Sequence, residues 1–144
     1  MIRALRHLSA SYRRELAGVA AVERAARTNH YPGKVQRGEI AEDAAQDDWR
    51  AWEAIARWCT GVPIDFDVGF EQMALAAGKA LQSREGELQQ AVAAAVGGER
   101  LDRLTWRRDG AAELAQILAD HAAWLADLNA ELRRRAAEGE GMAA

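Results

Sequence analysis

The chain has 144 residues, a formal net charge of −3 and a single cysteine. This length suits one domain that buries a core without a metal or a disulfide bridge, and the slight negative charge excludes a general attraction to nucleic acid or anionic lipid. A lone cysteine excludes an internal disulfide bridge and predicts a reducing, cytoplasmic location.

The composition predicts an all-α protein. Hydrophobic residues make up 49% of the chain and there are only two prolines, while alanine, the strongest helix former, is abundant. No segment approaches the ~18 consecutive apolar residues of a membrane-spanning helix, so we expect no membrane association. We predict a single helical bundle of four to five helices over residues 1–144, with a frayed tail from about residue 138.

The first predicted helix covers residues 2–29. Apolar side chains recur there at spacings of three and four, which places them on one face: Leu5, Leu8, Tyr12, Leu16, Val19, Val22 and Ala26. The arginines lie mostly off this stripe, as expected for a solvated helix face. The alternative is a nucleic-acid surface made by the arginines of this helix and of the last helix, although acidic residues are interspersed among them.

A turn at Tyr31-Pro32-Gly33 is predicted to end this helix, because proline disfavours the α conformation in the residue before it. The second helix is expected over residues 39–59, with acidic side chains in its first turns. We expect Trp49 and Trp52 to anchor the core. Trp58 projects from another face of the helix and needs a second surface to pack on.

The third helical stretch covers residues 68–96. The sequence leaves open whether this stretch is one helix or two, because Gly86 lies inside it and glycine weakens a helix. Asp65 or Asp67 is a candidate N-cap. Residues 99–108 are expected to form a short connector.

The last helix is predicted over residues 111–137, with Asp109 as its N-cap. Its apolar seam has the heptad spacing that suits a bundle or a coiled-coil partner, and it consists of Leu114, Leu118, His121, Leu125, Leu128 and Leu132. The predicted interaction surface is formed by Leu114, Leu118, Leu125, Leu128, Leu132 and Trp58.

The segment from Glu23 to Ile55 carries a distinct local pattern. Its residues are Glu23, Arg27, Tyr31, Pro32, Val35, Gly38, Ile40, Ala45 and Trp52-Glu53-Ala54-Ile55. The pattern resembles a group of short, uncharacterised bacterial and phage-associated helical proteins with a Tyr-Pro turn. It departs from that group at Thr28-Asn29-His30, where the group has consecutive basic residues. The resemblance implies a helix–turn–helix element and a phage or prophage context, and it implies no catalytic residue.

Three polar side chains, Glu23, Asp48 and His121, fall within or beside the predicted apolar stripes. Buried charges are costly unless they are paired, neutralised or bound to a metal. Packing of the helices therefore predicts either a structural network or an acid–histidine cluster. Such a cluster would be the catalytic and metal-binding site of a hydrolase. Glu39 and Glu42 resemble a fragment of the magnesium site of all-α nucleotide pyrophosphatases, but the second half of that pattern is missing.

The favoured function is a non-enzymatic helical interaction or accessory protein of phage or prophage origin. It would bind a protein partner or form a homodimer. The sequence contains no signature of a phosphate loop, a dinucleotide-binding turn or a multi-cysteine zinc site, so we expect no cofactor. Cys59 lies on an apolar face and is expected to be a small buried residue. A metal-dependent hydrolase and a nucleic-acid-binding protein are the alternatives.

Overall fold

The computed structural model describes residues 9–64 and 67–143. These residues form four helices and no strand: α2 (Ala10–Gln36), α3 (Glu42–Thr60), α4 (Phe70–Ala93) and α5 (Gly98–Ala143). The predicted all-α class, with four or five helices packed together, is therefore confirmed for the described residues. None of the helices in that part of the chain is long and apolar enough to cross a membrane.

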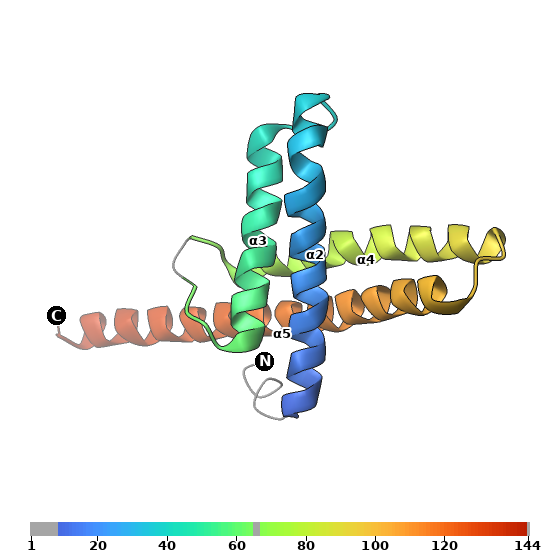
Figure 1. The fold of residues 1–144 in the computed structure, drawn as a ribbon. Helices are drawn as coiled ribbons and strands as arrows, with labels where there is room; N and C mark the ends of the chain where they lie inside the picture. The colour runs from blue at the N-terminus through green and yellow to red at the C-terminus, as the bar shows by residue number, and fades with distance from the viewer. Residues whose placement is uncertain (1–8, 65–66, 144) are drawn as a thin grey trace.

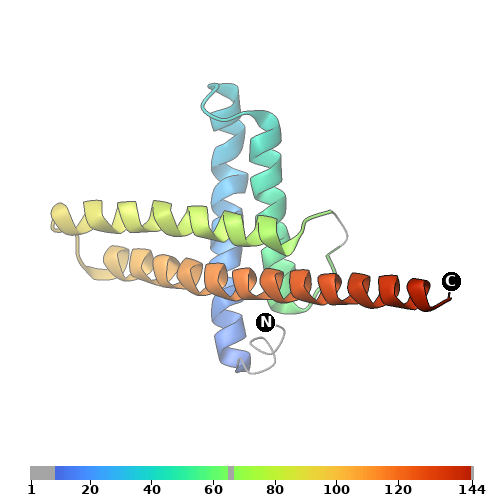
Figure 2. The same cartoon turned by 180° about the vertical axis from the view of Figure 1, so that it is seen from behind.

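The helices form two hairpins laid across each other. Helices α2 and α3 run antiparallel as one hairpin, and α4 and α5 run antiparallel as the second, which lies crosswise to the first (Figures 1 and 2). Side chains from all four helices contribute to one hydrophobic core. Its largest fully buried apolar members are Trp52, Ile55, Met73, Leu114, Leu118 and Val19. One core thus joins the two hairpins, as expected when amphipathic layers bury their apolar faces against each other.

Helix α2 does not stop at the Tyr-Pro-Gly motif, so that prediction is wrong. The helix continues through Pro32 to Gln36, and the chain reverses at Gly38, which has a left-handed φ of 71°. Glycine adopts this conformation without the steric cost that other residues incur. Contacts with α3 favour the extra helical turn, because the hydroxyl of Tyr31 donates a 2.5 Å hydrogen bond to Asp48. Residues 2–8 of the predicted first helix lie outside the described residues.

Helix α4 is a single helix through Gly86, which answers the question that the sequence left open. Its N-cap is Gly69, whose backbone N–H donates to the side chain of Gln72 at 3.2 Å, so Asp67 is not the cap. Asp65, the other candidate cap, lies outside the described residues.

Helix α5 starts earlier and ends later than predicted. Residues 99–108 are helical rather than a connector, and Asp109 lies inside the helix rather than at its N-cap. Long-range contacts hold these residues against α2: the indole N–H of Trp106 donates to Glu15 at 2.8 Å, and Arg107 reaches Glu23. At the other end, the helix continues through the expected frayed tail to Ala143.

Helices α2 and α5 approach closely at the point where the hairpins cross. A Cβ atom on Gly110 would lie 2.4 Å from the Cγ2 atom of Val19. Gly18 is also close to the other helix, since its Cβ would lie 3.5 Å from the ring of Trp106. The missing side chain at Gly110 therefore sets how near the two hairpins can come.

We expect Gly110→Ala to lower the free energy of unfolding by about 1–3 kcal/mol, because the new methyl group overpacks the crossing. Gly86→Ala is the matched control: it lies inside α4 with open space around it, and better helix propensity should raise stability by about 0.5–1 kcal/mol. Urea denaturation followed by circular dichroism measures both changes. Equal stabilisation by the two alanines would contradict the close approach.

Candidate functional site

Glu23 is fully buried and lies at the centre of a cluster of arginines. Its carboxylate accepts hydrogen bonds from Arg27 at 2.8 Å and from Arg107 at 3.0 Å, and Arg84 lies 3.6 Å away. These three arginines belong to α2, α5 and α4 respectively. A buried carboxylate is tolerated only when it is paired and hydrogen-bonded. The cluster, which we call the Glu23 junction, therefore joins three helices through one charge.

The junction continues onto the fourth helix, α3, through Asp48. The Nε atom of Arg27 lies 2.5 Å from the carboxylate of Asp48, which also accepts the hydroxyl of Tyr31. Burial alone would lower the pKa of Arg27, but Asp48 and Glu23 outweigh it and raise that pKa. The guanidinium also lies 4.9 Å from the ring centroid of Trp52, within the range of a cation–π contact. The predicted core position of Trp52 is confirmed, since it is fully buried.

Tyr31 is fixed as a neutral hydrogen-bond donor. Burial and the hydrogen bond to Asp48 raise the pKa of Tyr31 to about 12. A phenol with this pKa keeps its proton at neutral pH. The Tyr31 hydroxyl is therefore placed to hold Asp48 in position.

His121 lies in a separate aromatic cluster. Its ring centroid is 4.1 Å from that of Phe70, 5.9 Å from that of Trp58 and 6.0 Å from that of Trp124. Its Nδ1 atom is buried and has no hydrogen-bond partner. Burial lowers the pKa of His121 below its ordinary value of 6.5. The imidazole is thus neutral and packs as an aromatic ring.

The structure therefore brings Glu23 and Asp48 together through Arg27 but places His121 among different neighbours. Among the described residues, no group of three or more histidines, cysteines, aspartates or glutamates is arranged to hold a metal ion. The predicted acid–histidine cluster of Glu23, Asp48 and His121 does not form. The two carboxylates are instead charge partners for arginine, which is the structural-network alternative.

Cys59 is buried, as predicted. Burial raises the pKa of its thiol to about 12. Since only the thiolate is a strong nucleophile or metal ligand, this side chain is unreactive at neutral pH.

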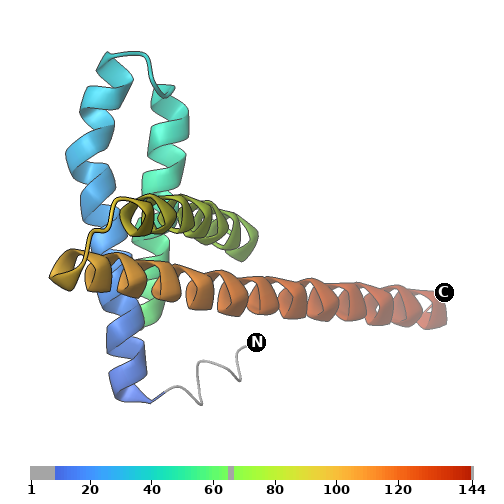
Figure 3. The ribbon, with the colours of Figure 1, turned by 90° about the vertical axis from the view of Figure 1, so that its right-hand side faces the viewer.

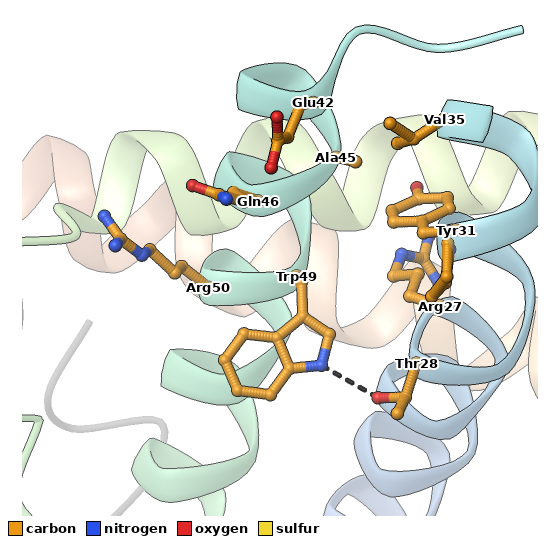
Figure 4. A pocket seen from close by; sticks show the side chains of 10 residues that line it. Arg27, Thr28, Tyr31, Val35, Glu42, Ala45, Gln46, Trp49 and Arg50 are labelled. Carbon is orange, nitrogen blue, oxygen red and sulfur yellow. Dashed lines mark hydrogen bonds between the residues drawn. The ribbon is translucent and has the colours of Figure 1, made fainter. Parts of the chain in front are cut away.

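An open groove runs between α2 and α3, close to the junction (Figure 4). Its volume is about 580 Å³ and its walls include Tyr31, Pro32 and Trp49. The indole N–H of Trp49 donates to the hydroxyl of Thr28 at 2.9 Å, so the ring is held along one wall. Trp49 remains 36% exposed, and the prediction that it anchors the core is wrong.

The leucine seam of α5 divides into a buried half and an open half. Leu114 and Leu118 are fully buried in this chain's own core, so neither can contact a partner as predicted. Leu125 is half-buried, whereas Leu128 and Leu132 are 38% and 54% exposed. Only the second half of the predicted interaction seam is open to another molecule.

Trp58 packs on a second surface, as its position on α3 predicted. Its ring meets that of Phe70 edge to face, with centroids 5.9 Å apart, and lies at the same distance from His121. Much of the Trp58 side chain therefore packs within this chain's own fold and is not available to a partner.

Sequence reasoning missed Arg84 and Arg107, which complete the junction. A signal was available, because a glutamate on an apolar stripe requires cations from the helices that cover it. This signal could not tell which arginines these would be, since the sequence does not show which helices cross.

Comparisons with protein-family models, with curated proteins and with solved structures found no match to the chain.

Glu23→Gln should lower the free energy of unfolding by about 3 kcal/mol, because it leaves buried arginines without their shared counter-charge. The control is Glu131→Gln, which removes an exposed carboxylate paired with Arg134 and Arg135 and should leave the unfolding midpoint unchanged. Urea titrations compare the two variants. Similar midpoints for Glu23→Gln and the wild type would show that the junction is not a stabilising centre.

Stability should fall as the pH decreases from about 8 to about 5, and His121 should account for part of this fall. The unfolded histidine takes up its proton near 6.5, whereas burial lowers the pKa in the folded chain, so protonation favours unfolding. His121→Phe should flatten the pH dependence of the unfolding free energy in this range. His30→Gln, on exposed surface, should preserve it. An unchanged slope in His121→Phe would contradict this assignment.

Proposed function

We propose that this protein is a non-enzymatic helical interaction protein that self-associates through the α4–α5 hairpin. The observation that carries the proposal is the set of large apolar side chains that this hairpin leaves exposed. Leu75 on α4 is 65% exposed, and Leu128 and Leu132 on α5 are also open. Exposed apolar side chains gathered on one element are typical of protein–protein contact sites.

The length of α5 supports the same proposal. At 1.5 Å per residue, its 46 residues extend about 69 Å, whereas the 24 residues of α4 extend about 36 Å. The C-terminal part of α5 consequently projects beyond the other helices (Figure 3). It carries the open half of the leucine seam away from the core. Helices in proteins gain most of their stability from tertiary packing of an apolar face, and this part of α5 has no such packing within the described chain.

The nucleic-acid alternative has weaker support, because many of the arginines already face carboxylates. Arg24 and Arg57 pair with Glu53, and Arg27, Arg84 and Arg107 belong to the Glu23 junction. These pairs reduce the positive charge available to phosphate groups.

The hydrolase alternative loses its proposed site, because His121 lies apart from Glu23 and Asp48. Glu39, of the pyrophosphatase-like fragment, pairs with Arg37 at 3.0 Å. A phage or prophage origin and a cytoplasmic location stay predictions.

Sedimentation velocity on the full chain tests self-association over a concentration range from about 1 µM to about 1 mM. We expect a concentration-dependent shift from monomer to dimer. The triple variant Leu75→Ser/Leu128→Ser/Leu132→Ser should remain monomeric with unchanged helix content, because these side chains are exposed. A wild-type chain that stays strictly monomeric throughout would contradict the proposal.

A further inference from the structure

We propose that the partner is a second copy of this chain, bound across the outer face of the α4–α5 hairpin with a two-fold axis near Leu75. This inference rests on the proposed function and names the surface that performs it. The outer face is the side of α4 and α5 turned away from α2 and α3. Figure 2 shows this hairpin in front of the other two helices, with nothing in the described chain covering it.

The outer face contains a hollow that is suited to an aliphatic side chain. A groove of about 590 Å³ runs between α4 and α5, and its walls are mostly alanine and glycine. They include Ala74, Gly78, Ala119, Ala122, Ala123 and Ala126. Small residues at a helix surface let a second helix or a large side chain approach closely, as in ridges-into-grooves packing.

A large apolar side chain stands on the rim of that hollow. Leu75 lines the groove and also a second hollow against α3, yet 65% of its surface is exposed. A two-fold axis through Leu75 presents the same patch on both copies, so that Leu75 of one copy faces Leu75 of the other. The two side chains would then pack against each other beside the grooves and lose their contact with water.

Two charged side chains on α4 also suit a two-fold arrangement of the copies. Glu71 and Lys79 lie four residues before and four residues after Leu75, and both line the groove. None of the ion pairs among the described residues includes either side chain, although Lys79 also lines a hollow with Asp47 and Asp48 of α3. A two-fold axis through Leu75 places Glu71 of one copy opposite Lys79 of the other, twice in each dimer. Complementary charges of this kind fix the register of an interface.

The size of the contact suits a weak dimer. Around an axis at Leu75, residues 70–80 of α4 and the neighbouring part of α5 form a surface about 17 Å long and about 20 Å wide, which presents about 350 Å² on each copy. Both copies together would bury about 700 Å², at the low end of protein–protein contacts. We therefore expect a dimer of low affinity that forms at high protein concentration.

Charge exchange tests the two-fold arrangement on the full chain by sedimentation equilibrium. Glu71→Lys alone and Lys79→Glu alone should each weaken dimerisation about tenfold, because each creates two like-charge contacts across the interface. The double variant Glu71→Lys/Lys79→Glu should recover to within about threefold of the wild type. Failure of the double variant to recover would overturn the pairing.

Leu75→Ser should weaken dimerisation at least about tenfold. Val92→Ser is the matched control, because Val92 is 63% exposed on the same helix but lies outside the groove. Equal effects of these two variants would overturn the assignment of Leu75. A wild-type dimer that resists both Leu75→Ser and the charge changes but dissociates in Leu128→Ser/Leu132→Ser would refute this interface while preserving self-association. A strictly monomeric wild type would refute both.

Discussion

The fold depends on the satisfaction of one buried carboxylate. Glu23 is fully buried on α2 and is met by Arg27 from its own helix, by Arg107 from α5 and by Arg84 from α4. Through Arg27 the same network reaches Asp48 on α3. Hydrophobic burial alone is non-directional, whereas hydrogen-bonded ion pairs require defined geometry. The Glu23 junction can thus specify where the two hairpins cross, in addition to holding them together.

The crossed arrangement of the two hairpins determines which helix surfaces remain exposed. The α2–α3 hairpin covers only part of the length of α5, so the leucine seam is buried at Leu114 and Leu118 and open at Leu128 and Leu132. It also covers one side of α4 and α5 and leaves their outer face free (Figures 2 and 3). A compact arrangement around one axis would bury more of these helices. The crossed arrangement exposes the surfaces that we propose for association.

Local periodicity predicted much of the core. The buried positions of Glu23, Trp52 and Leu114 follow from the 3.6-residue repeat of an amphipathic helix, and the all-α class follows from composition. What the sequence alone could not show is how the helices cross. Helix α2 passes through Pro32, and α5 includes Trp106, because contacts with distant residues outweigh local preferences. Propensity is a weak guide where such contacts exist.

The candidate site, like the fold, could be predicted from the sequence only in part. Periodicity identified Glu23, Asp48 and His121 as polar residues near apolar stripes, but it carried no information about which of them would meet. The structure joins the first two through Arg27 and surrounds His121 with aromatic rings. The leucine seam was found from its heptad spacing, yet the sequence could not tell whether this chain or another one covers it. Leu75 escaped notice because a single exposed leucine has no periodic signal.

Native-state hydrogen exchange measures most directly whether the Glu23 junction makes the two hairpins one cooperative unit. If it does, the slowest amides of α2 and α3 and those of α4 and α5 near the crossing should exchange with the same free energy, equal to that of global unfolding. Distinct free energies for the two hairpins, with one opening while the other stays folded, would contradict the central role of the junction.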